Sequence, residues 1–391
     1  MPKCSLRLKN TARSNSWSFS VNTGTVNALM ALHPKGKGKQ PETVLRQRFI
    51  NPMAIIKQLL LFLTITQYAF SQELRFKKIE IDTNYSFRGL SVVDDSVAWV
   101  SGIKGSIGRS TNGGNKWTFT QVKGFEKWDF RTLYAFNSNE AVIANAGSPA
   151  YILRTDDGGS NWNIVYTNND SMAFFDGVDF WNDREGIIYG DPINGRMLLL
   201  STADGGKSWQ ELPKQRRPAM SEGEASFAAS GTGIRCYGKE KAIIATGGKV
   251  SRLFISEDKG KNWNTISTPI IQGENSTGIF SFTFNTDSTG IIVGGDYKKN
   301  TLKVNHVFYT TNSGKSWSAP QNVTGGYREC VEFVTENTAI AVGPEGADIS
   351  YNSGKGWQPI PDQKNFDVIR KARKGRLVVA AGNKKISTLI H

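Results

Sequence analysis

The chain has 391 residues, of which 48 are Lys or Arg and 34 are Asp or Glu, and its formal net charge is +14. Nine basic residues and a single acid, Glu42, fall within residues 1–52, so most of the excess charge belongs to that segment and a nucleic-acid partner is not expected. With three His and three Cys in the chain, we expect no metal centre, Ser-His-Asp triad, disulfide framework or cofactor.

A segment with the features of a secretory signal peptide occupies residues 53–71. It has a short basic start that ends at Lys57, an apolar run at residues 59–65, and small side chains that fit a cleavage site before Gln72. The apolar run is too short to span a bilayer comfortably. We expect an exported protein, periplasmic or extracellular, with no stable membrane span after cleavage. A membrane anchor or a buried strand is the alternative.

This segment divides the chain into three parts. Residues 1–52 are expected to be disordered, or to be an upstream extension that precedes the true start at Met53. Residues 72–391 are expected to form a single domain and to be monomeric.

One motif recurs six times in that domain. Each copy has the order Ser/Thr-x-Asp/Asn-x-Gly-x-x-Trp and lies between two apolar stretches. The copies are assigned to Asn112, Asp156, Asp204, Asp258, Asn312 and Asn352, with the tryptophans Trp117, Trp162, Trp209, Trp263, Trp317 and Trp357. The tryptophans are 40 to 54 residues apart, which is the period of a β-propeller blade.

The chemistry of the motif indicates a structural role. The Asp or Asn side chain can accept hydrogen bonds from backbone N–H groups of its own turn, and the Gly allows a positive φ. The Trp is large and flat, so we expect it to pack between neighbouring blades. Because one blade cannot bury both of its faces, the copies need one another.

Seven strand starts accompany the six motifs. They lie at Phe87, Phe130, Phe175, Ser226, Ile279, Tyr327 and Phe366. The seventh unit has three strands before the chain ends, and residues 74–81 supply an outer strand ahead of the first unit. We therefore predict an all-β, seven-bladed propeller closed by its N-terminal strand on the C-terminal blade, a closure that removes the exposed sheet edges. A six-bladed ring is the alternative and leaves residues 365–391 as a tail.

The motif is the Asp-box, or BNR repeat, and the chain from about residue 74 resembles the photosystem II assembly and stability factor-like family. Further matching stretches are Gly190–Arg196, Gly223–Gly231, Gly278–Phe282, Val293–Tyr297 and Ala341–Pro344. Sialidases and sortilin-type receptors are more distant relatives by the same motif. The resemblance implies an interaction or assembly module that binds a partner protein.

Strand direction places the motif turns on the opposite face of the ring from the strand starts. Charged residues recur beside the aromatic residue at five starts, in consecutive blades: Arg88, Arg131 and Arg328, with Asp176 and Asp367. Nearby loops add Asp191 and Glu222. Arginine binds carboxylate, phosphate or sulfate in a bidentate pose. We interpret the cluster as an arginine-lined mouth that binds a protein segment or an anionic ligand such as a glycan. The alternative is a neutralised Arg/Asp network that only satisfies the inner strands.

Catalysis is the less favoured hypothesis. Sialidase-like glycoside hydrolysis is the alternative function, and it needs a carboxylate pair or a Tyr–Glu pair within reach of one sugar ring. The candidates are Glu224, Asp296 and Tyr297. A dinucleotide-dependent oxidoreductase is not supported, because the glycines near residue 231 lack the third glycine and the strand–helix setting of the Rossmann fingerprint.

Overall fold

The structure, a computed structural model, describes residues 8–10, 17–21, 24–27 and 74–390. The chain divides into two units, Met1–Ser71 and Gln72–His391. In the first unit, three short strands form an antiparallel sheet: β1 (Leu8–Asn10), β2 (Trp17–Val21) and β3 (Gly24–Asn27). The predicted signal peptide lies outside the described residues, as does most of the segment before it. Within the described residues, none of the helices has the length and apolar character needed to span a membrane.

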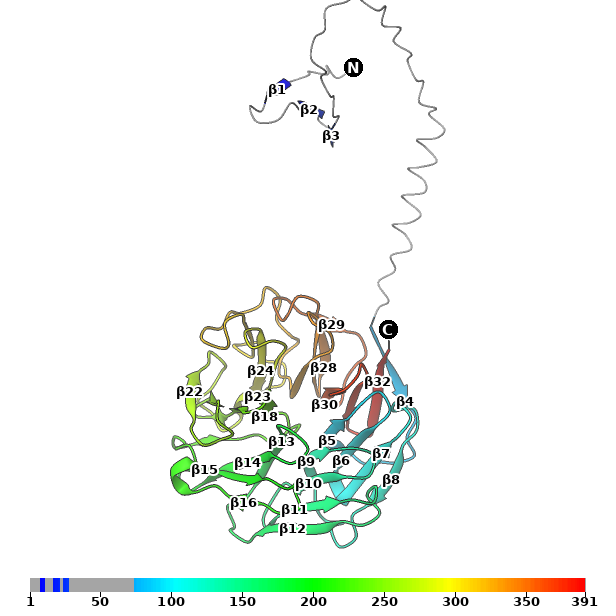
Figure 1. Ribbon diagram of the computed structural model, residues 1–391, viewed down its shortest axis with the longest axis vertical. Helices are drawn as coiled ribbons and strands as arrows, with labels where there is room; N and C mark the ends of the chain where they lie inside the picture. Colours follow the sequence, from blue (N-terminus) through cyan, green and yellow to red (C-terminus); the bar gives the residue numbers. More distant parts are fainter. Residues whose placement is uncertain (1–7, 11–16, 22–23, 28–73, 391) are drawn as a thin grey trace, which may run out of the picture. The chain divides into compact units, whose positions relative to one another are not determined.

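Residues 74–390 form a ring of seven antiparallel sheets, which confirms the seven-bladed propeller (Figure 1). From the inner to the outer strand, the first three blades are β5 (Phe87–Val92), β6 (Ala98–Gly102), β7 (Ser106–Ser110) and β8 (Thr118–Gln121); β9 (Phe130–Ala135), β10 (Ala141–Asn145), β11 (Ala150–Thr155) and β12 (Asn163–Asn168); and β13 (Phe175–Phe180), β14 (Gly186–Ile193), β15 (Arg196–Thr202) and β16 (Gln210–Glu211). Two short 3-10 turns, η1 (Ile103–Gly105) and η2 (Lys214–Arg216), lie in this part of the chain.

The remaining four blades complete the ring. Blade four is β18 (Ile234–Tyr237), β19 (Lys241–Ala245), β21 (Arg252–Ser256) and β22 (Asn264–Ser267). Blade five is β23 (Thr277–Phe284), β24 (Gly290–Asp296) and β25 (Val307–Thr310), with β20 (Gly247–Gly248) and β17 (Glu224–Ala225) added beyond β23. Blade six is β26 (Cys330–Phe333), β27 (Ala339–Gly343), β28 (Gly346–Ser350) and β29 (Gln358–Ile360), and blade seven is β30 (Phe366–Lys371), β31 (Val378–Gly382), β32 (Lys385–Ile390) and β4 (Arg75–Ile79).

The N-terminal strand of the ring closes the last blade, as predicted. β4 pairs antiparallel with β32, with Ile79 opposite Ile386 and Phe76 opposite Leu389. The ring of Phe76 also packs against the buried Phe366 at a centroid distance of 5.2 Å. The six-bladed alternative is therefore wrong, because its proposed C-terminal tail is three strands of a complete blade.

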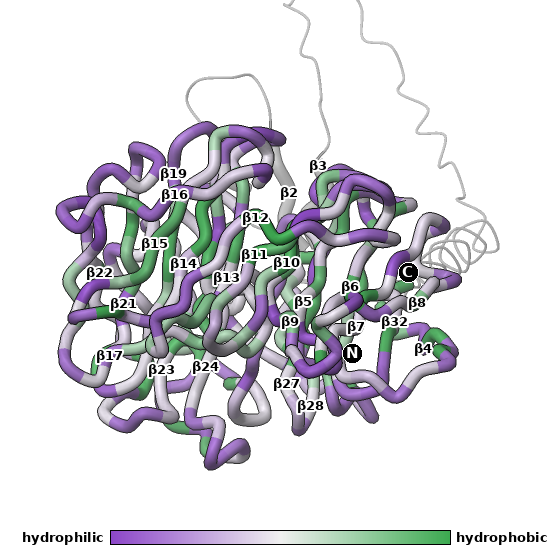
Figure 2. The backbone as a smooth tube through the Cα atoms, turned by 90° about the horizontal axis from the view of Figure 1, so that it is seen from below, coloured by the Kyte–Doolittle hydropathy of each residue, from purple (hydrophilic) through white to green (hydrophobic). Residues whose placement is uncertain are grey.

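Hydrophobic residues occur mainly along the strands, and hydrophilic residues occur mainly in the connecting loops (Figure 2). The inner three strands of the blades are almost entirely buried, because each blade is covered by a neighbour on both faces. The core is thus a series of apolar layers between adjacent blades, each with residues from two sheets. The loops at both ends of the strands remain free to carry polar groups.

The Asp-box turns are built from their own hydrogen bonds. In the first box, Oγ of Ser110 donates to Oδ1 of Asn112, and the backbone N–H of Lys116 donates to the same oxygen at 2.9 Å. The same two contacts recur in the other five copies. Each box then packs on the preceding blade. A Cβ added at Gly159, whose φ is +84°, would lie only 3.1 Å from the Trp99 ring of blade one.

The second box corrects one assignment. Asp157 makes the contacts there, accepting from Thr155 Oγ1 at 2.9 Å and from the Asn161 N–H at 2.9 Å, whereas we predicted Asp156. The two acids are adjacent in sequence. The turn requires the acceptor to stand five residues before the Trp, as Asn112 stands before Trp117, and only Asp157 has that spacing from Trp162.

Blade four begins later than predicted. The expected start at Ser226 is not an inner strand, because that role belongs to β18, which begins at Ile234. The preceding strand β17 pairs with β20 instead, and the segment 226–229 then enters the mouth of the ring. There the carbonyl of Ala229 accepts a hydrogen bond from Arg88 of blade one. This segment becomes part of the candidate site.

Candidate functional site

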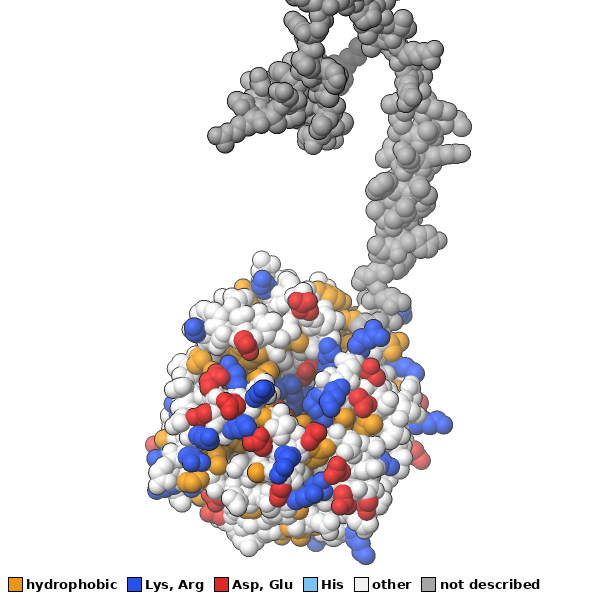
Figure 3. Space-filling model, viewed as in Figure 1, with side chains coloured by type: hydrophobic (Ala, Val, Ile, Leu, Met, Phe, Trp, Pro, Cys, Tyr) orange, Lys and Arg blue, Asp and Glu red, His pale blue; other side chains and the backbone are white. Residues whose placement is uncertain are grey.

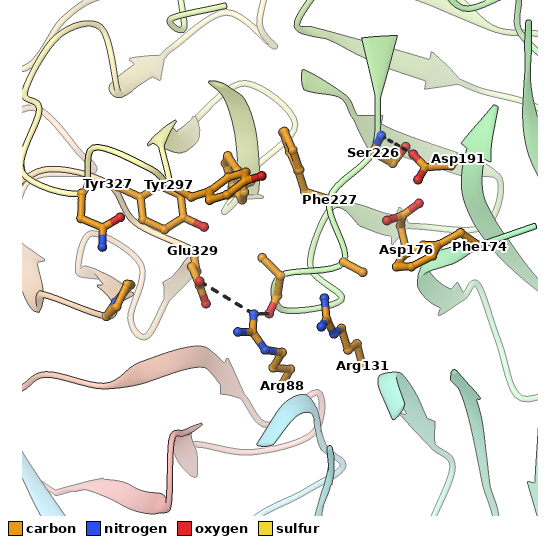
Figure 4. A pocket seen from close by; sticks show the side chains of 15 residues that line it. Arg88, Arg131, Phe174, Asp176, Asp191, Ser226, Phe227, Tyr297, Tyr327 and Glu329 are labelled. Atoms are coloured by element: carbon orange, nitrogen blue, oxygen red, sulfur yellow. Dashed lines mark hydrogen bonds and ion pairs between the residues drawn. The ribbon is translucent and has the colours of Figure 1, made fainter. Parts of the chain in front are cut away.

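A cavity of about 430 Å³ lies at the mouth of the ring, where the inner strands begin (Figure 4). Its lining combines arginines, carboxylates and aromatic rings: Arg88, Arg131, Phe174, Asp176, Asp191, Ser226, Phe227, Ala228, Ala229, Phe280, Tyr297, Asn300, Tyr327, Glu329 and Pro344. Of the predicted ligand-binding residues, Arg88, Arg131, Asp176 and Asp191 are brought together here. We call this cavity the mouth pocket.

A β-bulge turns the charged side chains inward. In blade one Phe87 pairs with Gly102, but Gly89 already pairs with the adjacent Ser101, so Arg88 is left unpaired in the ladder. The same shift in the pairing register leaves Asp176 unpaired in blade three and Asp367 in blade seven. A bulge re-aims the side chain of the extra residue. Each blade that has this bulge thus presents one variable residue to the centre of the ring.

The structure places Arg328 outside this set, in contrast to our prediction. In blade six the N–H of Glu329 donates to the carbonyl of Val342, and Cys330 pairs with the same residue, so Glu329 is the bulged residue. Arg328 is 3% exposed, and its Nε and Nη2 atoms lie 2.7 and 2.5 Å from Oδ2 of Asp348. A slip of one residue along a strand sends a side chain to the other face. The mouth therefore holds a glutamate where an arginine was expected.

The two arginines of the mouth pocket retain free donors. Arg88 Nη1 donates to the Ala229 carbonyl at 3.3 Å and lies 3.9 Å from Oε1 of Glu329. Burial disfavours the charge on Arg88, but the nearby carboxylates, Glu329 first, raise its pKa above the ordinary value. Arg131 Nε donates to Asp129 at 2.7 Å, while its two terminal nitrogens have no hydrogen-bond partner among the described residues. Both guanidinium groups can therefore donate hydrogen bonds to a further anion.

The acidic side of the mouth pocket is more deeply buried. Asp176 is fully buried, and neither carboxyl oxygen has a hydrogen-bond partner among residues 74–390. Burial and the neighbouring Asp191 raise the pKa of Asp176 well above its usual range, with Arg131 opposing the shift. Asp191 accepts the backbone N–H of Ser226 at 2.9 Å, and burial raises its pKa as well. These carboxyls therefore hold their protons to a higher pH than exposed ones.

A second acidic pair lies on the far side of Arg88. Glu329 is buried, and burial together with Asp367 raises its pKa well above the usual range. Burial likewise raises the pKa of Asp367, against the charge of Arg88. Asp367 is 6% exposed and supports the pocket from behind rather than lining it. Arg88 is thus the counter-charge for both carboxyls.

Aromatic side chains form the remaining wall, which sequence reasoning missed. Phe227 and Phe280 stack with ring centroids 3.9 Å apart, and Tyr297 and Tyr327 meet Phe280 edge-on. Phe280 occupies in blade five the bulge position that Arg88 occupies in blade one. Tyr297 is 44% exposed at the rim, so part of this aromatic wall faces solvent. An apolar group can be covered there while a charged group binds the arginines.

Comparisons with known proteins agree with this architecture. Residues 69–171 match the family model described as Photosynthesis system II assembly factor YCF48, and residues 196–341 match the model described as Sortilin, neurotensin receptor 3. Both matched segments lie within or overlap the propeller. The chain is a BNR-repeat propeller similar to YCF48.

Individual relatives differ in how much of the chain they cover. The photosystem II stability/assembly factor HCF136, chloroplastic, of Oryza sativa subsp. japonica is 25% identical over 153 residues. That match spans 36% of the present chain and 33% of the relative, so the chain covers about a third of that protein's length. A solved structure of YCF48 bound to D1 peptide has a TM-score of 0.59 at 17% identity and covers 80% of this chain and 96% of its own. YCF48 from Cyanidioschyzon merolae has a TM-score of 0.59 at 15% identity, covering 80% and 98%. These structures show the shared fold.

The other predicted site residues do not assemble into a reactive centre. Glu224 is buried, and its carboxylate binds Arg252 through contacts of 2.9 and 2.7 Å, so it serves the packing of blade four. Asp296 is 4% exposed and accepts the backbone N–H of Lys298 at 3.0 Å. Glu222 is exposed and does not line the mouth pocket. Of the three proposed catalytic residues, only Tyr297 reaches the cavity.

Proposed function

We propose that the propeller binds a segment of another protein in the mouth pocket. The observation that carries this proposal is the presence, in one cavity, of arginine donors that no described residue satisfies and of a four-ring aromatic wall. An acidic side chain of the segment would bind Arg131 and Arg88, and an apolar neighbour would cover the aromatic wall. The similarity to YCF48, a protein solved with a D1 peptide, supports a peptide as the class of ligand.

The acidic side of the pocket would orient the segment. Extended peptides carry backbone N–H donors, and the unpartnered oxygens of Asp176 are buried acceptors that such donors can satisfy. Buried acceptors that gain a partner only on binding favour a ligand that supplies donors at the right place. The pocket would therefore select a segment that combines a negative side chain with an extended backbone.

A panel of fluorescein-labelled hexapeptides tests the proposal. Each peptide carries one Glu and one Phe at varied spacing, and each has a matched control with Gln in place of Glu. We expect fluorescence anisotropy to show binding of Glu peptides that weakens about tenfold or more in Arg131→Ala, the loss typical of a hydrogen bond to a charged group. The affinity should also fall with added salt, because the contact is partly exposed.

Matched variants guard against indirect effects. Lys123→Ala removes an exposed positive charge that does not line the mouth pocket and should leave the affinity unchanged. If no Glu peptide binds better than its Gln control, or if the folded Arg131→Ala and Arg88→Ala proteins bind normally, the mouth pocket does not have this function. Binding of a sialylated or uronic glycan by the same arginines, with no peptide bound, would replace the protein segment by an anionic glycan.

We also propose that the propeller acts after export. The signal-peptide pattern of residues 53–71 supports this proposal, and the division of the chain into two units falls at the same Ser71–Gln72 bond. N-terminal sequencing of the protein from the extracytoplasmic fraction should find Gln72 as the first residue. An uncleaved protein recovered from the cytoplasm would contradict export.

A further inference from the structure

The opposite end of the central channel has an opening of its own. It has a volume of about 160 Å³ and is lined by residues at the C-terminal ends of the inner strands β5, β9, β13, β18 and β30. Figure 3 views the ring from the face opposite to that of Figure 4 and shows Lys and Arg side chains round the central hollow, with Asp and Glu side chains among them. The charged residues that line this opening are Arg235, Arg370, Lys371, Arg373 and Asp179. We call it the rear opening.

Two of its arginines share one carboxylate. Arg235 Nη2 lies 2.6 Å from Oε2 of Glu332, and Arg370 Nη1 lies 4.0 Å from the same oxygen. A single negative charge therefore serves two guanidinium groups. Burial and the neighbouring Arg235 lower the pKa of Arg370, which reflects an excess of positive charge. The buried Nε of Arg235 also has no hydrogen-bond partner among the described residues.

The third arginine is held by neutral groups. Arg373 donates to Oγ of Ser91 at 2.9 Å and to the carbonyl of Ala135, and it lies over the ring of Tyr134 at 4.2 Å from the centroid. These contacts fix the guanidinium without neutralising it. Asp179, the one acid in the lining, accepts backbone N–H groups from Phe180 and Cys236. The rear opening thus has four cations and, with Glu332, two carboxylates.

We propose that the rear opening binds a small oxyanion, either a free phosphate or sulfate or the carboxylate of a protein segment. Pre-positioned guanidinium groups match the geometry of such anions, and a partly buried site strengthens each contact. The space is too small for a folded partner and suits one compact group. This site is separate from the mouth pocket and does not depend on the function proposed for it.

Inorganic phosphate titrated into the full-length protein, against chloride at matched ionic strength, is the test. A ligand that binds only the folded state raises the melting temperature in a saturable way, and calorimetry gives the affinity directly. We expect saturable binding that weakens about tenfold or more in Arg370→Met. Lys239→Met removes one exposed positive charge on the turn between β18 and β19, outside the lining of the rear opening, and should bind phosphate as the wild type does.

A second variant moves the affinity the other way. Glu332→Gln removes the carboxylate that occupies Arg235 and Arg370, so we expect tighter phosphate binding. This result tests the proposal even if Arg370→Met fails to fold, because partial unfolding of Glu332→Gln cannot raise its affinity for phosphate. Absence of saturable binding, equal affinity in a folded Arg370→Met, or weaker binding in Glu332→Gln would overturn the proposal. Loss of binding in Arg131→Met with retention in Arg370→Met would also overturn it, because the ion would then occupy the mouth pocket.

A competition arm identifies the source of the anion. N-acetylglutamate and phosphate are titrated separately and together. Tighter binding of phosphate assigns the rear opening to a free inorganic anion, and tighter binding of N-acetylglutamate assigns it to a carboxylate of a protein segment. Failure of both, in a protein whose melting temperature is otherwise normal, removes the site.

Discussion

Arg88 and Glu329 occupy the same bulge position in blades one and six and meet across the mouth of the ring, with Nη1 of the arginine 3.9 Å from Oε1 of the glutamate. That distance is too long for a hydrogen bond, so the pair leaves donors of Arg88 available. Glu329 is at the same time a competitor for any anion that enters. The pair makes the charge of the mouth pocket dependent on pH.

We predict that anions bind the mouth pocket more tightly as the pH falls. Burial and Asp367 raise the pKa of Glu329, so it takes up a proton at a higher pH than an exposed glutamate, while Arg88 stays charged. A hexapeptide with cysteic acid in place of Glu and a rhodamine label in place of fluorescein keeps its own charge, so anisotropy titrations from about pH 8 to about pH 5 report the titration of the protein. Glu329→Gln should bind more tightly at the upper end and show a flatter dependence. An equally steep dependence in Glu329→Gln would place the titrating group elsewhere.

Arg328 is predicted to act on stability rather than binding. It and Asp348 are both buried and paired, so Arg328→Met leaves an uncompensated charge and should lower the free energy of unfolding by about 3–5 kcal/mol. Urea denaturation measures this loss. The double variant Arg328→Met/Asp348→Leu should recover most of it, because no lone charge remains. A single variant of wild-type stability would show that the pair contributes little.

His306 is predicted to weaken the fold in acid. It is 1% exposed, with Nε2 3.3 Å from the Thr324 carbonyl, and burial lowers its pKa from 6.5 to about 4. Below pH 6.5 the unfolded chain takes up a proton that the folded protein does not, so the free energy of unfolding falls as the pH drops from 6.5 to about 4, and the loss due to His306 is complete below that pH. The loss is on the order of 3 kcal/mol. Urea unfolding at a series of pH values should show this fall in the wild type and a smaller one in His306→Gln.

The closing strand is predicted to be essential. Deleting residues 1–81 removes β4 and exposes the edge of β32, whereas deleting residues 1–71 leaves β4 in place. We expect the longer deletion to lower the melting temperature and to form dimers or aggregates on size-exclusion chromatography, because an unpaired edge strand recruits another chain. The shorter deletion should remain monomeric and as stable as the full chain. Equal behaviour of the two proteins would show that the ring is stable without β4.

The ring could be predicted because each blade is marked by a short motif whose contacts lie within a few residues of one another. An Asp-box closes its hydrogen bonds within its own turn, as Ser110 and Asn112 do, so the blades could be counted without knowing their neighbours. Closure followed from the leftover outer strand. Among the Asp-boxes, the error of Asp156 for Asp157 arose where two adjacent acids fit the pattern and only the distance to Trp162 separates them.

The candidate site depends on pairing across the chain and was less predictable. Tyr327-Arg328 resembles Phe87-Arg88, but the pairing of β26 with β27 places Glu329 in the bulge. The aromatic wall was missed for a similar reason. Phe227 reaches Phe280 only because β17 pairs with β20 and carries the segment after it into the mouth. Neither pairing has a signal in the neighbouring residues.

The pairing of β4 with β32 has a consequence for how the protein folds as it is synthesised. The first strand of the ring, β4, has β32 as its only partner, so it stays unpaired until residues 385–390 have been synthesised. A chain that stops short of this point leaves β4 without a partner and exposes an edge of β31, whatever the state of its other blades. Closure of the ring therefore requires synthesis through β32, and a shorter product keeps unpaired strand edges that chaperones and proteases can recognise.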